Sequence, residues 1–118
     1  MLILIAHGSR DIRWRTSVEQ VVASVQTDVG VDRVSLAYMD CTPPTLDDVV
    51  VGASARGIRR FRLLPLFLAT EGHVERDILP LVDAVRTSHP SIEIEVLEPV
   101  GQHPLFRELL REITVQVD

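Results

Sequence analysis

The 118-residue sequence predicts an α/β fold in which helices cover both faces of a four-stranded parallel sheet. Short apolar runs that suit buried strands alternate four times with segments whose apolar residues recur at helical spacing. Hydrophobic residues make up 46% and charged residues 25% of the chain, as in an ordinary globular domain. No linker or low-complexity stretch interrupts the pattern, so we expect one domain over residues 1–118.

The N-terminal half holds the first two strand–helix units. Met1–Ala6 is a continuous apolar run, short enough for a strand that is buried on both faces. A helix that Gly30 can end follows, with apolar residues at Val18, Val21, Val22, Val25 and Val29. Val34–Met39 is the second strand, and Thr45 can cap a helix that runs to about Ala55.

The C-terminal half repeats the pattern. Phe61–Leu68 is a third apolar strand, and the helix after it carries Pro80 within its first two turns, where a kink is expected. Ser91–Leu97 alternates apolar and charged residues, as a strand exposed on one face at a sheet edge does. An amphipathic helix follows, with apolar residues at Leu105, Phe106, Leu109, Leu110 and Ile113.

An exposed fourth strand and a fully apolar first strand favour the flavodoxin-like strand order 2-1-3-4, with right-handed crossovers. In open sheets of this kind, ligands bind beyond the carboxyl ends of the strands, where the strand order reverses. For this order, that point lies between the first and third strands. The residues that follow these strands are therefore candidate site residues.

Two histidines and a carboxylate follow the first three strands. His7 comes directly after the first strand, Asp40 after the second, and His73 after the third and a four-residue turn, at equal intervals of 33 residues. Imidazole and carboxylate groups bind Co, Ni, Fe or Zn and also accept protons near neutral pH. We expect all three residues to be catalytic, with His7 and His73 as metal ligands, although Asp40 could instead form a turn.

The composition excludes several classes of function. All twelve basic residues are Arg, so Schiff-base chemistry and the lysine-containing P-loop are ruled out. Cys41 is the only cysteine, which excludes a multi-cysteine zinc or iron–sulfur site within one chain. The net charge of −5 argues against non-specific nucleic-acid binding. No apolar run is long enough to span a membrane or act as a secretory signal, so we expect a cytoplasmic protein.

Two blocks of sequence resemble the short, single-domain class II chelatases, the sirohydrochlorin cobaltochelatases and ferrochelatases of the CbiX/SirB type. The blocks are LILIAHGSRD at residues 2–11 and LPLFLATEGHVERDI at residues 64–78. Weaker matches are Tyr38–Asp40, followed by Pro44 and Leu46, and residues 100–104. The resemblance implies a chelatase-like half domain that inserts Co²⁺ or Fe²⁺ into sirohydrochlorin without ATP, in cobalamin or sirohaem biosynthesis, and holds no tightly bound cofactor.

The resemblance also assigns roles to residues. His7 and His73 match the family's two active-site histidines, whereas Asp40 stands where the family usually has Glu. An anionic tetrapyrrole with eight carboxylates would explain the arginines near the rim, because helix N-termini there also favour anions. The residues expected to bind this substrate are Ser9, Arg10, Arg13, Glu71, Gly72, Arg76 and His103. Long members carry two such domains face to face, so the resemblance implies a homodimer.

Two other interpretations remain open. A non-catalytic carrier of metal or tetrapyrrole could share this fold, and Asp40 in place of Glu is the feature that favours it. The His7-Gly8 pair after the first strand is also found in histidine phosphatases, but there an Arg normally precedes the His, where this chain has Ala6.

Overall fold

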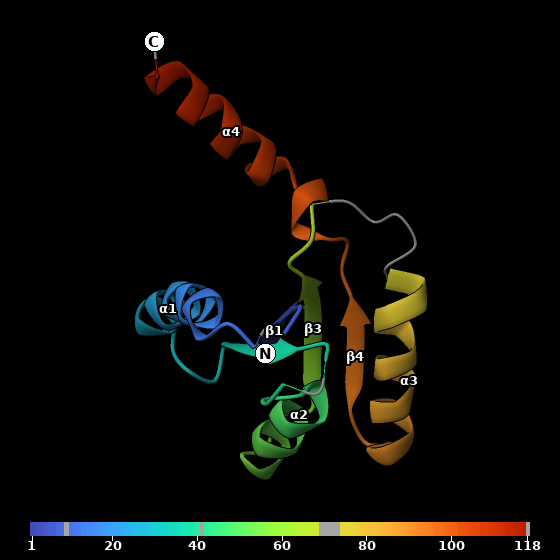
Figure 1. Ribbon diagram of the computed structural model, residues 1–118. Coiled ribbons are helices and arrows are strands. Elements are labelled where there is room, and N and C mark those ends of the chain that lie inside the picture. The colour runs from blue at the N-terminus through green and yellow to red at the C-terminus, as the bar shows by residue number, and fades with distance from the viewer. Residues whose placement is uncertain (9, 41, 69–73, 118) are drawn as a thin grey trace.

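The computed structural model describes residues 1–8, 10–40, 42–68 and 74–117. Its elements are β1 (Leu2–Ala6), α1 (Ile12–Val29), β2 (Val34–Tyr38), α2 (Leu46–Ala55), β3 (Arg60–Pro65), the π-helical turn η1 (Val74–Ile78), α3 (Leu79–Ser88), β4 (Glu93–Val96), the 3₁₀ turn η2 (Val100–Gln102) and α4 (Pro104–Gln116), as Figure 1 shows. This order confirms the four predicted strand–helix units. None of the described helices is both long and apolar enough to cross a membrane.

The sheet is parallel and has the predicted order, β2-β1-β3-β4. Leu4 in the centre of β1 lies opposite Leu36 of β2 and Leu64 of β3. The strand β4 pairs with β3 and lies at the sheet edge, as its alternating sequence predicts. Because the strands are parallel, the carboxyl ends of β1, β2 and β3 meet at one edge of the sheet, which we call the rim.

Helices cover the two faces of the sheet unequally. On one face, α2 and α3 enclose a large core that includes Ile3, Ile5, Phe61 and Leu63. On the other face, α1 packs against β1 and β2 around a smaller cluster of buried residues, namely Ala6, Val22, Leu36 and Tyr38. The helix α4 extends away from both layers in Figure 1. The predicted helices on both faces are therefore present, but α4 adds no cover to the sheet of its own chain.

Local sequence explains how α1 ends and α2 begins. Gly30 follows α1 with a φ of 103°, a conformation that favours glycine, and its N–H donates to Gln26 O. Thr45 caps α2: its hydroxyl accepts from Asp48 N at 3.1 Å, and the Asp48 carboxylate accepts from Thr45 N at 3.0 Å. This reciprocal pair is a capping box. Both predicted boundaries are confirmed.

The region around Pro80 differs from the single helix that we expected. The turn η1 (Val74–Ile78) has π-helical hydrogen bonding, and the regular helix α3 begins only at Leu79, with Pro80 in its first two positions. Proline has no N–H to continue an α-helical ladder, but it is tolerated in the first turn of a helix. The two parts of this segment therefore meet just before Pro80.

The buried ring of Tyr38, the only tyrosine of the chain, joins β2 to α1. Tyr38 is 1% exposed, and its hydroxyl donates a hydrogen bond to Glu19 Oε1 at 2.8 Å. Burial and, after it, this bond to Glu19 raise the pKa of Tyr38 to about 12. The native fold therefore favours the neutral phenol.

We expect Tyr38 to make unfolding depend on pH above pH 10. Because the folded pKa is raised, the contribution of the neutral phenol is complete below pH 10 and is lost as the pH rises toward 12. Between pH 9 and 11.5, the wild type should lose about 2 kcal/mol of unfolding free energy that the Tyr38→Phe variant retains. Urea denaturation at each pH measures this difference. Equal losses in both proteins would contradict the assignment.

Candidate functional site

His7 lies at the rim, directly after β1. Its side chain is exposed, and its ring centroid is 5.1 Å from that of Phe67, which follows β3. The pairing of β1 with β3 produces this contact, since Leu66 N donates to Ile5 O at 2.8 Å as the two strands end. The imidazole is therefore supported by an aromatic ring and remains accessible from solvent.

Asp40 reaches the same rim because the loops after β1 and β2 touch. The loop after β2 turns back, so that Tyr38 N donates to Pro44 O at 2.9 Å. A Cβ on Gly8 would lie 2.8 Å from Thr42 Cβ and 3.4 Å from Asp40 Oδ2. Only glycine fits this approach without displacing Thr42. The carboxylate of Asp40 is thereby held beside the residue that follows His7.

A pocket of about 440 Å³ opens at this rim. It is lined by His7, Met39, Asp40, Arg76, Asp77, Pro80 and Leu81. The ends of β1 and β2 thus face η1 and the start of α3 across one hollow. The pocket combines an imidazole, carboxylates and a guanidinium, which can bind a metal, accept a proton and attract an anion.

Three of the predicted site residues, His7, Asp40 and Arg76, line this pocket together. Asp77 also lines it, and our reading of the sequence missed this residue. The sequence could have indicated Asp77, because this residue directly follows Arg76 on the segment after the third strand. An adjoining pocket of about 410 Å³ shares Met39, Asp40 and Leu81 and extends between α2 and α3.

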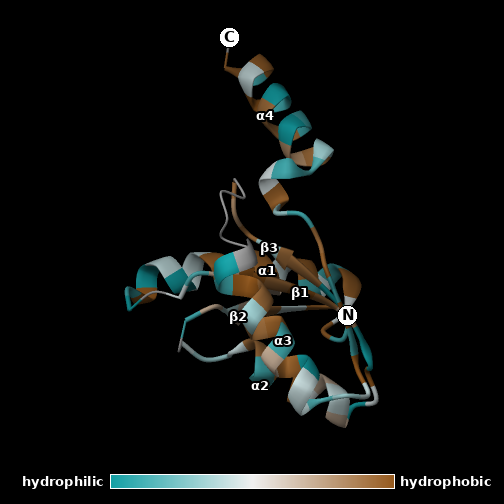
Figure 2. Cartoon of the chain, turned by 90° about the vertical axis from the view of Figure 1, so that its right-hand side faces the viewer, coloured by the Kyte–Doolittle hydropathy of each residue, from teal (hydrophilic) through white to brown (hydrophobic). Residues whose placement is uncertain are grey.

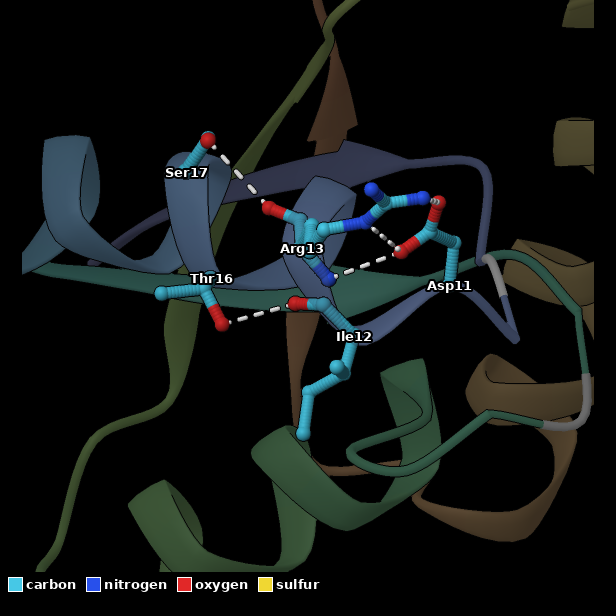
Figure 3. A network of polar contacts seen from close by, with 5 residues as sticks. All are labelled: Asp11, Ile12, Arg13, Thr16 and Ser17. Atoms are coloured by element: carbon cyan, nitrogen blue, oxygen red, sulfur yellow. Dashed lines mark hydrogen bonds and ion pairs between the residues drawn. The ribbon is translucent and has the colours of Figure 1, made fainter.

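Arg13 stabilises the start of α1 and is not among the residues that line either rim pocket. Asp11 caps this helix by accepting from Arg13 N at 2.9 Å, and the Arg13 guanidinium contacts the same carboxylate through Nε and Nη2, each at 3.2 Å (Figure 3). This side-chain contact, more than the backbone bond, lowers the pKa of Asp11. Because the Arg13 side chain is 89% exposed, the ion pair stabilises the helix only slightly.

Arg10 and His103 also lie outside both pocket linings within the described residues. Arg10 is exposed in the loop after β1. His103 caps α4, because its Nδ1 accepts a hydrogen bond from Leu105 N at 3.1 Å. That nitrogen is occupied by the helix, which leaves only Nε2 for another partner.

Four predicted site residues, Ser9, Glu71, Gly72 and His73, lie outside the described residues. Within the described ranges, no three His, Cys, Asp or Glu side chains are grouped closely enough to hold a metal ion. The predicted trio of His7, Asp40 and His73 includes one of the residues outside these ranges. It therefore stays a prediction.

The fold and the rim define an α/β protein with a pocket at the carboxyl ends of its strands, lined by an imidazole, two carboxylates and a guanidinium. The family model of CbiX matches residues 1–117. The chain belongs to the CbiX family.

Curated relatives include chelatases of two kinds. The sirohydrochlorin cobaltochelatase of Methanopyrus kandleri is 31% identical over 77 residues, which cover 65% of this chain and 54% of that protein. The chloroplastic sirohydrochlorin ferrochelatase of Arabidopsis thaliana is 24% identical over 94% of this chain and 49% of its own length. The chain thus spans about half the length of these two relatives. It covers 92% of the Sulfurisphaera tokodaii sirohydrochlorin cobaltochelatase, at 22% identity.

Solved structures share the fold. A Marinobacter aquaeolei VT8 protein, provisionally described as a CbiX protein of cobalamin (vitamin B12) biosynthesis, is 31% identical, with a TM-score of 0.85. The match covers 98% of this chain and 92% of that one. The sirohydrochlorin chelatase SirB of Bacillus subtilis subspecies spizizenii, solved in complex with cobalt, gives a TM-score of 0.76 at 20% identity, over 86% of this chain and 44% of SirB. At that identity, the likeness shows the fold alone.

The turn η2 presses against the segment that leaves β3. Gly101 N donates to Phe67 O at 3.0 Å, and a Cβ on Gly101 would collide with the backbone of Leu68. Gly52 in α2 is different, because the nearest atom to a Cβ there is Arg56 Nη1 at 3.8 Å.

We expect alanine at these two glycines to change stability in opposite directions. Gly101→Ala should lower the unfolding free energy by about 1–3 kcal/mol, because the η2 backbone must move away from Leu68. Gly52→Ala should raise it by about 0.5–1 kcal/mol, because alanine favours a helix interior and meets no clash. Thermal denaturation of both variants checks this. A Gly101→Ala protein as stable as the wild type would rule out the tight contact.

Proposed function

We propose that this protein inserts Co²⁺ or Fe²⁺ into sirohydrochlorin without ATP. The observation that carries the proposal is the CbiX match over residues 1–117. Relatives named as sirohydrochlorin cobaltochelatases and a ferrochelatase support the substrate and both metals. In this reaction, one divalent metal ion replaces two pyrrole N–H protons, so the protein must deliver a metal and accept protons at the same place.

His7 and His73 are the proposed metal ligands. His7 is accessible from the rim and borders the pocket, which supports a role in passing the metal to the ring. A neutral imidazole binds Co²⁺ and Fe²⁺ and can also accept a pyrrole proton. With few protein ligands, the metal keeps open coordination positions into which the ring nitrogens can enter.

Asp40 and Arg76 have complementary proposed roles. Asp40 accepts the second proton or holds the metal during transfer. Its side chain is one methylene shorter than that of the glutamate that the family usually has at this position. Arg76 binds carboxylates at the edge of the macrocycle, because a guanidinium pairs with carboxylates in a two-pronged geometry. Further proposed contacts with the substrate around the same rim are Ser9, Arg10, Arg13, Glu71, Gly72 and His103.

The proposed working form is a homodimer. The 440 Å³ rim pocket is near the lower end of volumes that accept a drug-sized ligand, and a macrocycle with eight carboxylates is larger than that. The chain corresponds to about half of two chelatase relatives, so a second copy can provide the facing half of a cleft. The cytoplasmic location stays a prediction from the sequence.

Replacing His7 should abolish most of the activity. The assay is an anaerobic absorbance measurement of sirohydrochlorin with Co²⁺ or Fe²⁺, corrected for the spontaneous reaction. We expect His7→Ala to lower kcat/KM by about 100-fold or more, since it removes both a ligand and a proton acceptor. His89→Gln is the matched control, because His89 contacts Asp47 between α3 and α2 and does not line the rim pocket.

Each outcome of this assay has a defined meaning. A wild-type rate no faster than the spontaneous reaction, with tight binding of sirohydrochlorin, would replace the chelatase by a non-catalytic carrier. Hydrolysis of a generic phosphomonoester without metal would instead indicate a phosphatase. Full activity in His7→Ala would leave the reaction standing and overturn the site.

Asp40 and Arg76 should give different kinetic signatures. Asp40→Asn keeps the shape but loses the proton acceptor, so kcat should fall by roughly tenfold to 100-fold. Asp40→Glu restores the carboxylate and should retain activity. Arg76→Gln should mainly raise KM, because it weakens binding of the anionic ring. An unchanged KM in Arg76→Gln would exclude the proposed carboxylate contact.

A further inference from the structure

The rim pocket continues into a second pocket, which we call the side pocket. It lies between α2 and α3, which pack side by side (Figure 2). Its volume is about 410 Å³, against about 440 Å³ for the rim pocket. Met39, Asp40 and Leu81 line both pockets, so the two hollows meet at these residues. The role proposed for His7 leaves the side pocket unused, because His7 lines only the rim pocket.

The walls of the side pocket are apolar and firmly held. Leu46 at the start of α2 and Val85 in α3 are 2% and 5% exposed and belong to the large core. Met39 and Leu81 pack against the same core. A recess with such walls is formed before a ligand arrives, as small-molecule sites usually are.

Two small side chains line the opening of the side pocket. Ala84 and Ser88 lie about one helical turn apart on α3, and both are exposed. The side pocket is therefore open to solvent along α3. A larger side chain at either position would occupy the pocket without replacing a core residue.

The two pockets differ in charge. Arg76 lines the rim pocket, whereas none of the described basic residues lines the side pocket. The side pocket instead has two carboxylates in its lining, Asp40 and Asp47. Carboxylate groups of a ligand are therefore attracted toward Arg76 and repelled from the side pocket, whose apolar walls favour hydrocarbon.

We propose that one side of the sirohydrochlorin macrocycle enters the side pocket while the rest lies in the rim pocket. This binding mode rests on the proposed function, because it takes sirohydrochlorin as the ligand. The macrocycle is larger than the rim pocket, and the two pockets together provide roughly twice its volume. The carboxylates on the inserted side extend past Ala84 and Ser88 into water, and those on the opposite side face Arg76.

A macrocycle bound in this way is centred over the boundary between the pockets. Met39 and Leu81 support its flat face, and the flexible thioether side chain of Met39 adapts to an irregular contact. The pyrrole nitrogens lie near Asp40, which belongs to the same boundary, and His7 approaches them from the rim side. The other face of the ring stays accessible to a second copy of the chain. The side pocket thus orients the ring relative to both reacting side chains.

The first test measures binding of metal-free sirohydrochlorin by equilibrium dialysis. Ala84→Trp and Ser88→Trp fill the side pocket from its opening, so each should raise the dissociation constant by about tenfold or more. Thr87→Trp is the matched control and should leave it unchanged, because Thr87 is an exposed residue of α3 that lines neither pocket. Circular dichroism checks that each variant is folded. Unchanged binding in both filled variants would overturn the proposal.

The second test observes the bound ring without a bulky substitution. In NMR spectra of protein labelled at its alanine methyl groups, the aromatic macrocycle shifts the signals of methyl groups close to it. The Ala84 signal, assigned by its loss in Ala84→Ser, should move when metal-free sirohydrochlorin is added. The signal of Ala23 in α1, which lines neither pocket, should stay in place. An unmoved Ala84 signal at saturation would contradict the side pocket as part of the binding site.

Both tests use the ring without metal, so they are independent of metal insertion. A protein that binds the ring in the side pocket but inserts no metal would retain this binding mode and overturn the proposed reaction. A protein that inserts the metal while the Ala84 signal stays unmoved would retain the reaction and overturn the binding mode. A wild type that does not bind sirohydrochlorin would overturn both.

Discussion

The strand β1 pairs with β2 on one side and with β3 on the other, and this pairing positions the loops that form the rim. Leu4 is opposite both Leu36 and Leu64, so the three strands are held in one parallel register. This register brings the residues after the strands to a single rim and aligns His7 with the loop that carries Asp40. Burial of Ile3 and Ile5 in β1 stabilises the arrangement, because a slip of one residue would turn these side chains to the other face.

Two glycines allow the loops at this edge to pack closely against each other and against the ends of the strands. Gly8 lets the loop after β2 approach the end of β1, and Gly101 lets η2 pack against the segment after β3. The first contact places the carboxylate of Asp40 close to Gly8, and the second holds η2 against Phe67 and Leu68. Both contacts therefore lie at the same carboxyl edge of the sheet as the rim pocket.

Sequence periodicity was sufficient to predict the strand order, the edge position of β4 and the caps at Gly30 and Thr45, because these depend on local spacing and burial. The sequence also predicted that His7, Asp40 and Arg76 lie near the same edge of the sheet. It could not separate η1 from α3, since π-helical bonding has no distinct apolar period. Arg13 and His103 each make a side-chain hydrogen bond at the start of a helix. Residue spacing alone does not predict such bonds. The packing of η2 depends on a backbone contact between Gly101 and Leu68, which are remote in sequence.

We propose that a divalent metal binds at the rim beside His7. Anomalous diffraction at the cobalt edge, from crystals of the protein grown with Co²⁺, locates the metal directly. We expect the strongest peak at the rim, about 2.0–2.2 Å from a nitrogen of His7, as for an imidazole ligand. A strongest peak at His89 and Asp47, between α3 and α2, with none beside His7, would contradict it.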